Sequence, residues 1–409
     1  MTAAARPATD DDLEGIWQVF RLGFGVRPAE RDRWVRLIEP ARVQVVDGHE
    51  AGEIAAAAQV LRLHQHFGGR AVPLGGYSPV AVLPEHRGRG LGRTVVAAHL
   101  DVLRAEGVPI AGLFPSSVAL YRAVGFELAG SFVARRVPAA HLAAIGGSGG
   151  AGGTGAGAAG VVVRRGRAAD RDAVVACHRR LGPRVDGTLV RDEAMWARRL
   201  PPEGEGVELY VVDHPRRPGE LAGYGAFRLG PGRDPYDYGV VVDEVVAEDA
   251  ATRRALWRVV AGSGTQAPEV DLIGPAEDPV FLLAGAADPE AVRTEIRWML
   301  RLVDAAGAVA ARGWNPTARG RVDLEVRDGA APWNRGRWRL EVADGHGRLV
   351  PGGTGAVRLG IGALSCWWAG YHRAVTLADH GLVRATSERA LATLDGLGAA
   401  HPPTLTDFY

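Results

Sequence analysis

The chain of 409 residues has no lysine, because all 48 of its basic residues are arginine. Cysteine is nearly as scarce: Cys177 and Cys366 are the only two, and they lie far apart. They belong to no Cys-x-x-Cys or Cys/His cluster, which argues against a zinc site and against a disulfide scaffold. We therefore expect no bound metal, and an acyl donor finds no lysine side chain here to modify.

Two further absences concern membranes and nucleic acids. No apolar run reaches the ~18 residues of a membrane span, and the opening MTAAARP lacks the features of a secretory signal. A net charge of +1 provides no basic field for a nucleic acid. The sequence thus predicts a cytoplasmic protein, and its length and 47% hydrophobic content indicate two or three domains.

The most distinctive segment is a turn rich in arginine and glycine, within VAVLPEHRGRGLGR at positions 80–93. It follows an apolar strand and opens a helix in which Val96, Leu100 and Leu103 recur at helical spacing. Backbone N–H groups and the positive end of a helix form an anion site, and glycine lets a phosphate approach the backbone. We therefore expect a phosphate-bearing molecule to bind Arg87, Gly88, Arg89, Gly90, Leu91, Gly92 and Arg93.

Known phosphate motifs differ in what they require of such a turn. The P-loop needs a lysine, and the Rossmann fingerprint needs a third glycine where this chain has none. The pattern that fits is Arg-x-x-Gly-x-Gly at 87–92, which resembles the pyrophosphate loop of the GCN5-related N-acetyltransferases (GNATs). The alternative is an ordinary glycine-rich turn. The order downstream favours the GNAT interpretation: a strand at 110–114, two serines, and a short helix at 118–124.

Composition divides the chain into segments. Residues 1–142 have the pattern of one α/β unit, and nine glycines among residues 146–160 mark a linker, which we place at 143–160. Residues 161–300 repeat a similar order, but the turn at 247–253, AEDAATR, has two carboxylates and no glycine and would repel a pyrophosphate. An alternative is that the two segments are independent α/β domains. Residues 301–409 have the pattern of an α+β unit.

The chain as a whole resembles the Eis (enhanced intracellular survival) family of acetyltransferases. The resemblance rests on FRLGFG at 20–25, the 80–93 motif, ALWR at 255–258, WMLRLVD at 298–304 and the ending DFY. It implies a mixed α+β fold with a catalytic GNAT domain, a degenerate GNAT-like domain that binds no coenzyme A, and a C-terminal domain like a sterol carrier protein (SCP2-like). It also implies a homohexamer and acetyl-CoA as co-substrate.

The resemblance also assigns residues to the acetyl-CoA site. The backbone of Val80, Ala81 and Val82 is expected to bind the pantetheine arm, and the turn at 87–93 the pyrophosphate. Ser116 and Ser117 are expected near the acetyl end. Gly88 departs from the family pattern, in which a basic residue is common at this position. The absence of that basic residue would weaken phosphate binding slightly.

Acetyl transfer to an amine needs a base and an acid. An alkylammonium with a pKa of ~10.4 must lose a proton before it attacks, and the departing thiolate gains one. By the resemblance, Tyr121 is the acid and the terminal carboxylate of Tyr409 is the base. The alternatives are that Tyr121 is a core aromatic and that the chain end is frayed.

The acceptor is expected to be a cationic small molecule with a primary amine: an aminoglycoside, a polyamine or lysine. Phe24 and Trp34, with Phe20, are candidates for an aromatic wall of its site, or else for core positions. Asp407 is a candidate for an acidic contact.

Two other functions stay open. One is a non-catalytic protein that binds coenzyme A or lipid through the SCP2-like domain, where Leu364, Trp367 and Trp368 line a tunnel or else pack as core. The other is a sensor that binds coenzyme A without turnover.

Overall fold

The computed structural model describes residues 4–50, 52–146, 160–201, 206–231, 238–262, 267–275, 278–284, 291–398 and 400–409. Most of the predicted glycine-rich linker therefore lies outside the described residues. Contacts divide the chain into a first unit (1–130, 297–403 and 409) and a second unit (131–296 and 404–408). None of the described helices is long and apolar enough to cross a membrane.

The first unit contains a sheet whose strands follow the order of the chain. Its neighbours pair antiparallel except for the fourth and fifth strands, which are parallel. In spatial order its strands are β1 (Arg6–Pro7), β2 (Val43–Asp47), β3 (Ile54–Phe67), β4 (Arg70–Val82), β5 (Ile110–Leu113) and the last part of β12 (Ala291–Leu302).

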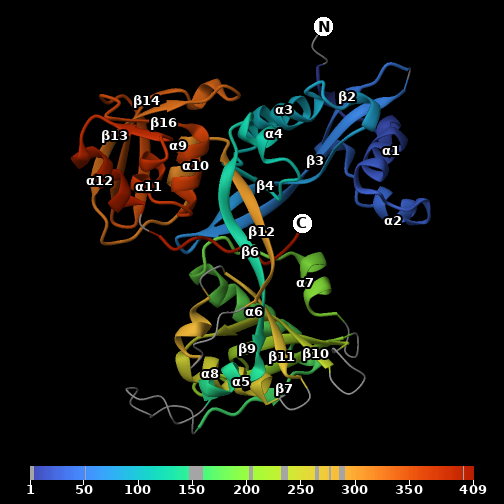
Figure 1. The fold of residues 1–409 in the computed structure, drawn as a ribbon, viewed down its shortest axis with the longest axis vertical. Helices are drawn as coiled ribbons and strands as arrows, with labels where there is room; N and C mark the ends of the chain where they lie inside the picture. Colours follow the sequence, from blue (N-terminus) through green and yellow to red (C-terminus); the bar gives the residue numbers. More distant parts are fainter. Residues whose placement is uncertain are drawn as a thin grey trace. The chain divides into compact units, whose positions relative to one another are not determined.

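Helices cover both faces of this sheet (Figure 1). On one face, Ile16, Trp17 and Phe20 of α1 are fully or almost fully buried against residues of β2, β3 and β4. On the other face, the apolar side of α3 packs on β3 and β5. The helices are α1 (Leu13–Phe24) and α2 (Arg31–Val35) on the first face, and α3 (Leu91–Ala105) and α4 (Val118–Arg122) on the second.

The second unit repeats this plan. Its strands β8 to β10 pair antiparallel, and β10 then pairs parallel with β11, as β4 does with β5. In spatial order its strands are the last part of β6 (Glu127–Pro138), β11 (Glu269–Gly274), β10 (Tyr238–Ala247), β9 (Leu221–Pro231), β8 (Val207–Asp213) and β7 (Arg164–Arg165), and its helices are α5 (Ala139–Gly146), α6 (Arg171–Leu181), α7 (Glu193–Arg199) and α8 (Ala250–Ala261).

Each unit completes its sheet with a strand from a distant part of the sequence. In the first unit, β5 pairs with residues 299–302 of β12, which follow the whole second unit in the chain. In the second unit, β11 pairs with residues 133–138 of β6, which directly continue the first unit. We call this arrangement the strand exchange.

The C-terminal part of the first unit is a separate layer of strands and helices. A five-stranded sheet has the order β15-β14-β13-β16-β17, with β13 and β16 parallel. Its strands are β13 (Gly320–Arg327), β14 (Gly336–Ala343), β15 (His346–Pro351), β16 (Val357–Gly360) and β17 (Val383–Ala385), and its helices are α9 (Ala305–Ala311), α10 (Ile361–Ala369), α11 (Ala374–Asp379) and α12 (Glu388–Leu397).

Candidate active site

The site begins where two parallel strands diverge. The register of β4 and β5 pairs Leu74 with Ile110 and ends with Gly76 opposite Gly112. Beyond that rung β4 continues to Val82 and stays paired with β3. Two β4 residues lie between Tyr77 and Val80, whereas only one β3 residue lies between their partners Val60 and Ala58, so β4 has a bulge there. Such a bulge redirects a strand. The edge of β4 at the predicted pantetheine residues Val80 to Val82 therefore turns away from β5.

The predicted phosphate turn follows this edge directly. Gly88 and Gly90 have φ angles of 77° and 80°, which glycine adopts without strain. The first helical bond of α3 is from Thr94 N–H to Gly90 O at 3.1 Å, so helix geometry leaves the amides of Leu91, Gly92 and Arg93 without an intrahelical acceptor. A Cβ on Gly92 would lie 2.9 Å from Leu120 Cδ1. The turn is thus shaped to present backbone donors, and Gly92 lets α3 pack against α4.

The charged residues of the turn are exposed, as an anion site requires. Arg87, Arg89 and Arg93 are all at the surface. The Arg87 Nε donates to Val82 O at 3.3 Å, and Arg89 Nη1 lies 2.6 Å from His49 Nε2. These residues fit a pyrophosphate, because the three guanidinium groups are positively charged and the α3 amides carry partial positive charge.

One group of side chains beside the turn has ligand types that bind metals. Glu53, Glu85 and His86 bring one ligand atom each within 4.8 Å of one another. The Glu53 carboxylate, however, accepts bonds from the amides of His49 and Glu50 and lies 3.2 Å from His86 Nε2, and these bonds lower its pKa. We therefore interpret the group as an anchor between the β2–β3 hairpin and the phosphate turn.

Tyr121 lies on α4 and is 5% exposed. Burial raises the pKa of its phenol to about 12, and a hydrogen bond with Ser116 opposes that shift. Its ring also packs edge-on against Phe126, with centroids 5.9 Å apart. Ser116 and Ser117 are exposed just before α4. Tyr121 therefore combines core packing with a phenol that keeps its proton at neutral pH.

Tyr409, the last residue, belongs to the first unit and lies at the divergence of β4 and β5. Its ring is 5.9 Å from that of Phe114, and a Cβ on Gly76 would be 2.7 Å from its Cε2. The phenol oxygen is buried with no hydrogen-bond partner among the described residues, and burial raises its pKa. The chain end is therefore packed against β4 and β5.

Comparisons with known proteins agree with this geometry. Residues 4–129 and 187–302 each match a family of acetyltransferase (GNAT) domains, and residues 305–406 match the sterol carrier protein domain. A solved GCN5-related N-acetyltransferase from Kribbella flavida is 31% identical, covers 100% of this chain and 99% of its own, and superposes with a TM-score of 0.80.

Curated relatives give the same result over most of the chain. N-acetyltransferase Eis of Mycobacterium tuberculosis is 29% identical over the full length of both chains. An uncharacterized N-acetyltransferase of Streptomyces avermitilis is 30% identical over 87% of this chain and 84% of its own. The chain belongs to the Eis-like GNAT N-acetyltransferases. The predicted family, mixed α+β fold and enzyme class are confirmed, and enzymes of this superfamily use acetyl-CoA.

In this acetyltransferase, the predicted acceptor contact Asp407 is ion-paired with two arginines. Its carboxylate accepts bonds from Arg191 Nε at 3.0 and 3.1 Å and from Arg199 Nη2 at 2.7 Å. Both arginines and Asp407 belong to the second unit. The prediction that Asp407 makes an acidic contact with the acceptor stays a prediction, and in the structure two guanidinium groups already compensate its charge. Asp407 anchors the C-terminal segment.

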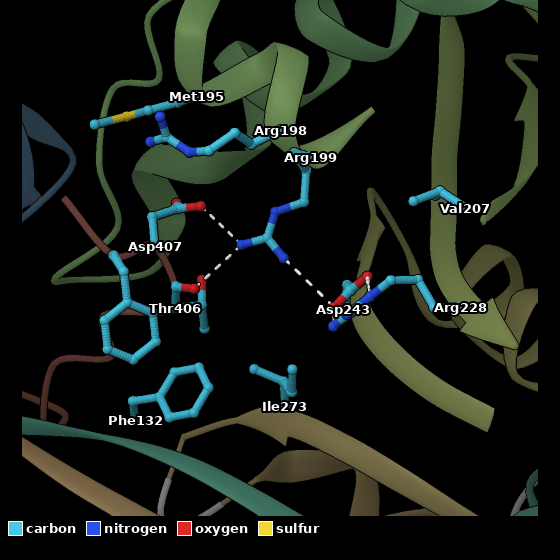
Figure 2. Close-up of a pocket in the computed structure, with 11 residues that line it drawn as sticks. Phe132, Met195, Arg198, Arg199, Val207, Arg228, Asp243, Ile273, Thr406 and Asp407 are labelled. Atoms are coloured by element: carbon cyan, nitrogen blue, oxygen red, sulfur yellow. Dashed lines mark hydrogen bonds and ion pairs between the residues drawn. The ribbon is translucent and has the colours of Figure 1, made fainter. Parts of the chain in front are cut away.

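The same segment lines a pocket of about 330 Å³ in the second unit (Figure 2). Arg199 stands at its centre in the figure, bonded to Thr406 O and Asp407 on one side and facing Asp243 on the other. Phe132 and Phe408 form one wall, with ring centroids 5.0 Å apart. The pocket is thus lined by arginines, partly compensated by aspartates, and by apolar side chains.

The three predicted acceptor-site aromatics differ in burial. Phe24, the last residue of α1, is 53% exposed and lies 6.1 Å from the half-buried ring of Trp34 on α2. Phe20 is fully buried in the core of the first unit. Phe24 and Trp34 form an accessible aromatic pair, whereas Phe20 has the core position that the sequence left as its alternative.

In the second unit, the strand equivalent to β4 is β10, and the turn that follows it differs from the phosphate turn. Asp249 caps α8, because its carboxylate accepts a hydrogen bond from Thr252 N at 2.8 Å. That carboxylate therefore occupies the start of α8, where a phosphate would bind. Glu248 is ion-paired with Arg180 and Arg217. A pyrophosphate at this turn would meet two carboxylates instead of open donors.

The tryptophans proposed as a lipid tunnel pack against protein groups. Trp367 Nε1 donates to Leu394 O at 3.1 Å, and the Trp368 ring lies 4.7 Å from that of Phe67. Leu364, Trp367 and Trp368 are all at most 1% exposed. They are core residues in the described part of the chain.

Sequence reasoning missed Gly76, Gly112 and Arg191, which contact the C-terminal residues. A signal for the glycines was present, since glycine inside a strand often marks a close approach of another group. Arg191 had no such signal, because it lies 216 residues before Asp407.

Proposed function

We propose that this acetyltransferase transfers acetyl from acetyl-CoA directly to a primary amine of a cationic small molecule of the aminoglycoside, polyamine or lysine type. The turn at 87–93 and the α3 amides bind the pyrophosphate, and the β4 edge at Val80 to Val82 binds the pantetheine arm. Acetyl-CoA supplies the activated acetyl group as a thioester. The second unit, whose α8 amides are capped by Asp249, takes no part in this binding.

The observation that carries the proposal is the place of Tyr409 at the divergence of β4 and β5, in contact with Phe114. Phe114 lies two residues before Ser116, whose hydroxyl is bonded to Tyr121. In the proposed reaction the terminal carboxylate takes a proton from the acceptor ammonium, directly or through a water. Tyr121, whose pKa is raised to about 12, holds the proton that the departing thiolate receives.

The acceptor side is supported by the accessible pair Phe24 and Trp34. Cations are attracted to the faces of aromatic rings, so this pair suits an ammonium group. We expect Trp34→Ala to raise the KM for the amine without changing the KM for acetyl-CoA. A homohexamer, which the family resemblance implies, is part of the proposal and is tested by light scattering of the full chain.

The test is release of coenzyme A thiol with acetyl-CoA and a panel of amines. Cys177 and Cys366 are buried with pKa values raised to about 11 and about 12, so the folded protein contributes little thiol background. A variant with one alanine appended after Tyr409 is expected to lose turnover while keeping its melting temperature. Full turnover by that variant would remove the terminal carboxylate from the mechanism, and no turnover with any amine would leave coenzyme A binding as the function.

A further inference from the structure

The last rung of the parallel ladder between β4 and β5 consists of two glycines. Gly76 faces Gly112 in the register, and beyond them the strands diverge. Two side chains are therefore missing at the same level of the sheet, where the pantetheine site begins. Neither glycine has a positive φ, so backbone conformation does not explain them.

The ring of Tyr409 fills the space that both glycines leave. A Cβ on Gly76 would lie 2.7 Å from Cε2 and 2.8 Å from Cδ2 of Tyr409. A Cβ on Gly112 would lie 3.0 Å from the phenol oxygen. The two positions thus contact different parts of one ring, its edge carbons and its hydroxyl.

Other groups close the space around the ring. The side chain of Leu63 lies 2.7 Å from the Cβ position of Gly76, and that of Leu74 lies 3.2 Å from the Cβ position of Gly112. Phe114 packs on the ring from the end of β5. An added methyl group at either glycine would therefore meet a leucine side chain as well as the ring.

We propose that Gly76 and Gly112 form a seat for the Tyr409 ring, and that this glycine seat fixes the position of the terminal carboxylate. The inference rests on the proposed function, in which that carboxylate is the base. Only two rotatable bonds join the ring to the Cα that bears the carboxylate, so a fixed ring restricts the carboxylate closely. Gly76 and Gly112 are positioning residues that act through Tyr409.

The seat predicts an unusual pattern of rescue. Gly76→Ala and Gly112→Ala each displace the ring, and we expect kcat to fall roughly tenfold to a hundredfold, as small misplacements of a reacting group do. Tyr409→Phe keeps the terminal carboxylate and removes only a buried hydroxyl without a described partner, so the kcat of Tyr409→Phe alone is the reference for the double variants. In Gly112→Ala the clash is with that hydroxyl, so adding Tyr409→Phe restores kcat. In Gly76→Ala the clash is with Leu63 and with ring carbons that phenylalanine keeps, so Tyr409→Phe does not restore kcat.

A matched control is Gly225→Ala on β9, another strand glycine, whose Cβ would make ordinary contacts of 3.8 and 3.9 Å. We expect it to leave kcat and the KM for acetyl-CoA unchanged. Melting temperatures of all variants distinguish displacement of the chain end from general unfolding. Unchanged kcat in Gly76→Ala and Gly112→Ala, or equal rescue of both by Tyr409→Phe, would overturn the seat.

A second readout does not depend on acetyl transfer. A carboxypeptidase that prefers aromatic residues should release residue 409 slowly from the wild type, faster from Gly112→Ala, and slowly again from Gly112→Ala with Tyr409→Phe. If this order is found but no amine is acetylated, the seat stands and the proposed function fails. If amines are acetylated and release of residue 409 is equal in all variants, the seat fails and the proposed function stands.

Discussion

The Nε atom of Arg191 lies 3.0 and 3.1 Å from the two carboxylate oxygens of Asp407, and both side chains are buried. The remaining guanidinium nitrogens of Arg191 donate to Glu244 at 2.7 and 2.8 Å. One arginine thus holds two carboxylates, one from the C-terminal segment and one from β10. This pairing holds residues 404–408 in the second unit. Asp407 lies two positions before Tyr409, whose terminal carboxylate is the proposed base.

Asp407→Asn should test that anchor. A hydrogen bond to a charged group contributes about 1.5–3 kcal/mol, so we expect the free energy of unfolding to fall by about 2 kcal/mol and kcat to fall as the chain end loosens. Denaturant unfolding and thiol release measure the two effects. Asp101→Asn, at an exposed position of α3, is the control and should change neither. A variant of normal stability and activity would show that the pair does not order the terminus.

Tyr121→Phe should separate binding from chemistry. The variant keeps the ring that packs on Phe126 but cannot donate a proton, so we expect kcat to fall roughly 100-fold or more. The affinity for acetyl-CoA, measured by calorimetry, should stay the same. Ser116→Ala removes only the bond that opposes the rise in the Tyr121 pKa and should have a much smaller effect. Normal turnover of Tyr121→Phe would assign Tyr121 to the core alone.

The pH dependence follows from the same phenol. The pKa of Tyr121 is raised to about 12, so the phenol stays protonated as the pH rises through the neutral range. The acceptor amine, in contrast, loses its proton toward its pKa of about 10.4. We therefore expect kcat/KM to increase steadily with pH and to show no decline below about pH 10. A decline that begins near neutral pH would contradict Tyr121 as the acid.

The phosphate turn can be tested with two glycines at opposite ends of α3. Gly90 and Gly107 have φ angles of 80° and 71°, and a Cβ on either would meet no atom within 4 Å. Alanine at each therefore imposes a similar backbone cost of about 1–2 kcal/mol. We expect only Gly90→Ala to weaken acetyl-CoA binding, measured by calorimetry. Equal affinities in the two variants would place the pyrophosphate elsewhere.

Local patterns in the sequence predicted much of this fold. The expected strand at 110–114, the short helix at 118–124 and the helix with Val96, Leu100 and Leu103 correspond to β5, α4 and α3, because runs of apolar residues and helical spacing are short-range signals. The phosphate turn was equally local, since its glycines and arginines are consecutive.

Contacts between distant residues were not predictable in this way. Asp407 has the composition of a substrate contact, but its partner Arg191 is identified only by the folded chain. The strand exchange has the same cause, since nothing near β5 indicates that residues 299–302 lie beside it.

The strand exchange also constrains the order of events during synthesis. β5 pairs with β4 on one edge, but its other edge can be covered by β12 only after the ribosome has translated the whole second unit. The nascent chain therefore exposes that edge of β5 for that time. Long-range pairing of this kind slows folding and favours association of nascent chains. A gene fragment that stops at the end of the first acetyltransferase segment would therefore encode an incomplete sheet, and a purification tag is better placed at the N-terminus, because Tyr409 carries the proposed base.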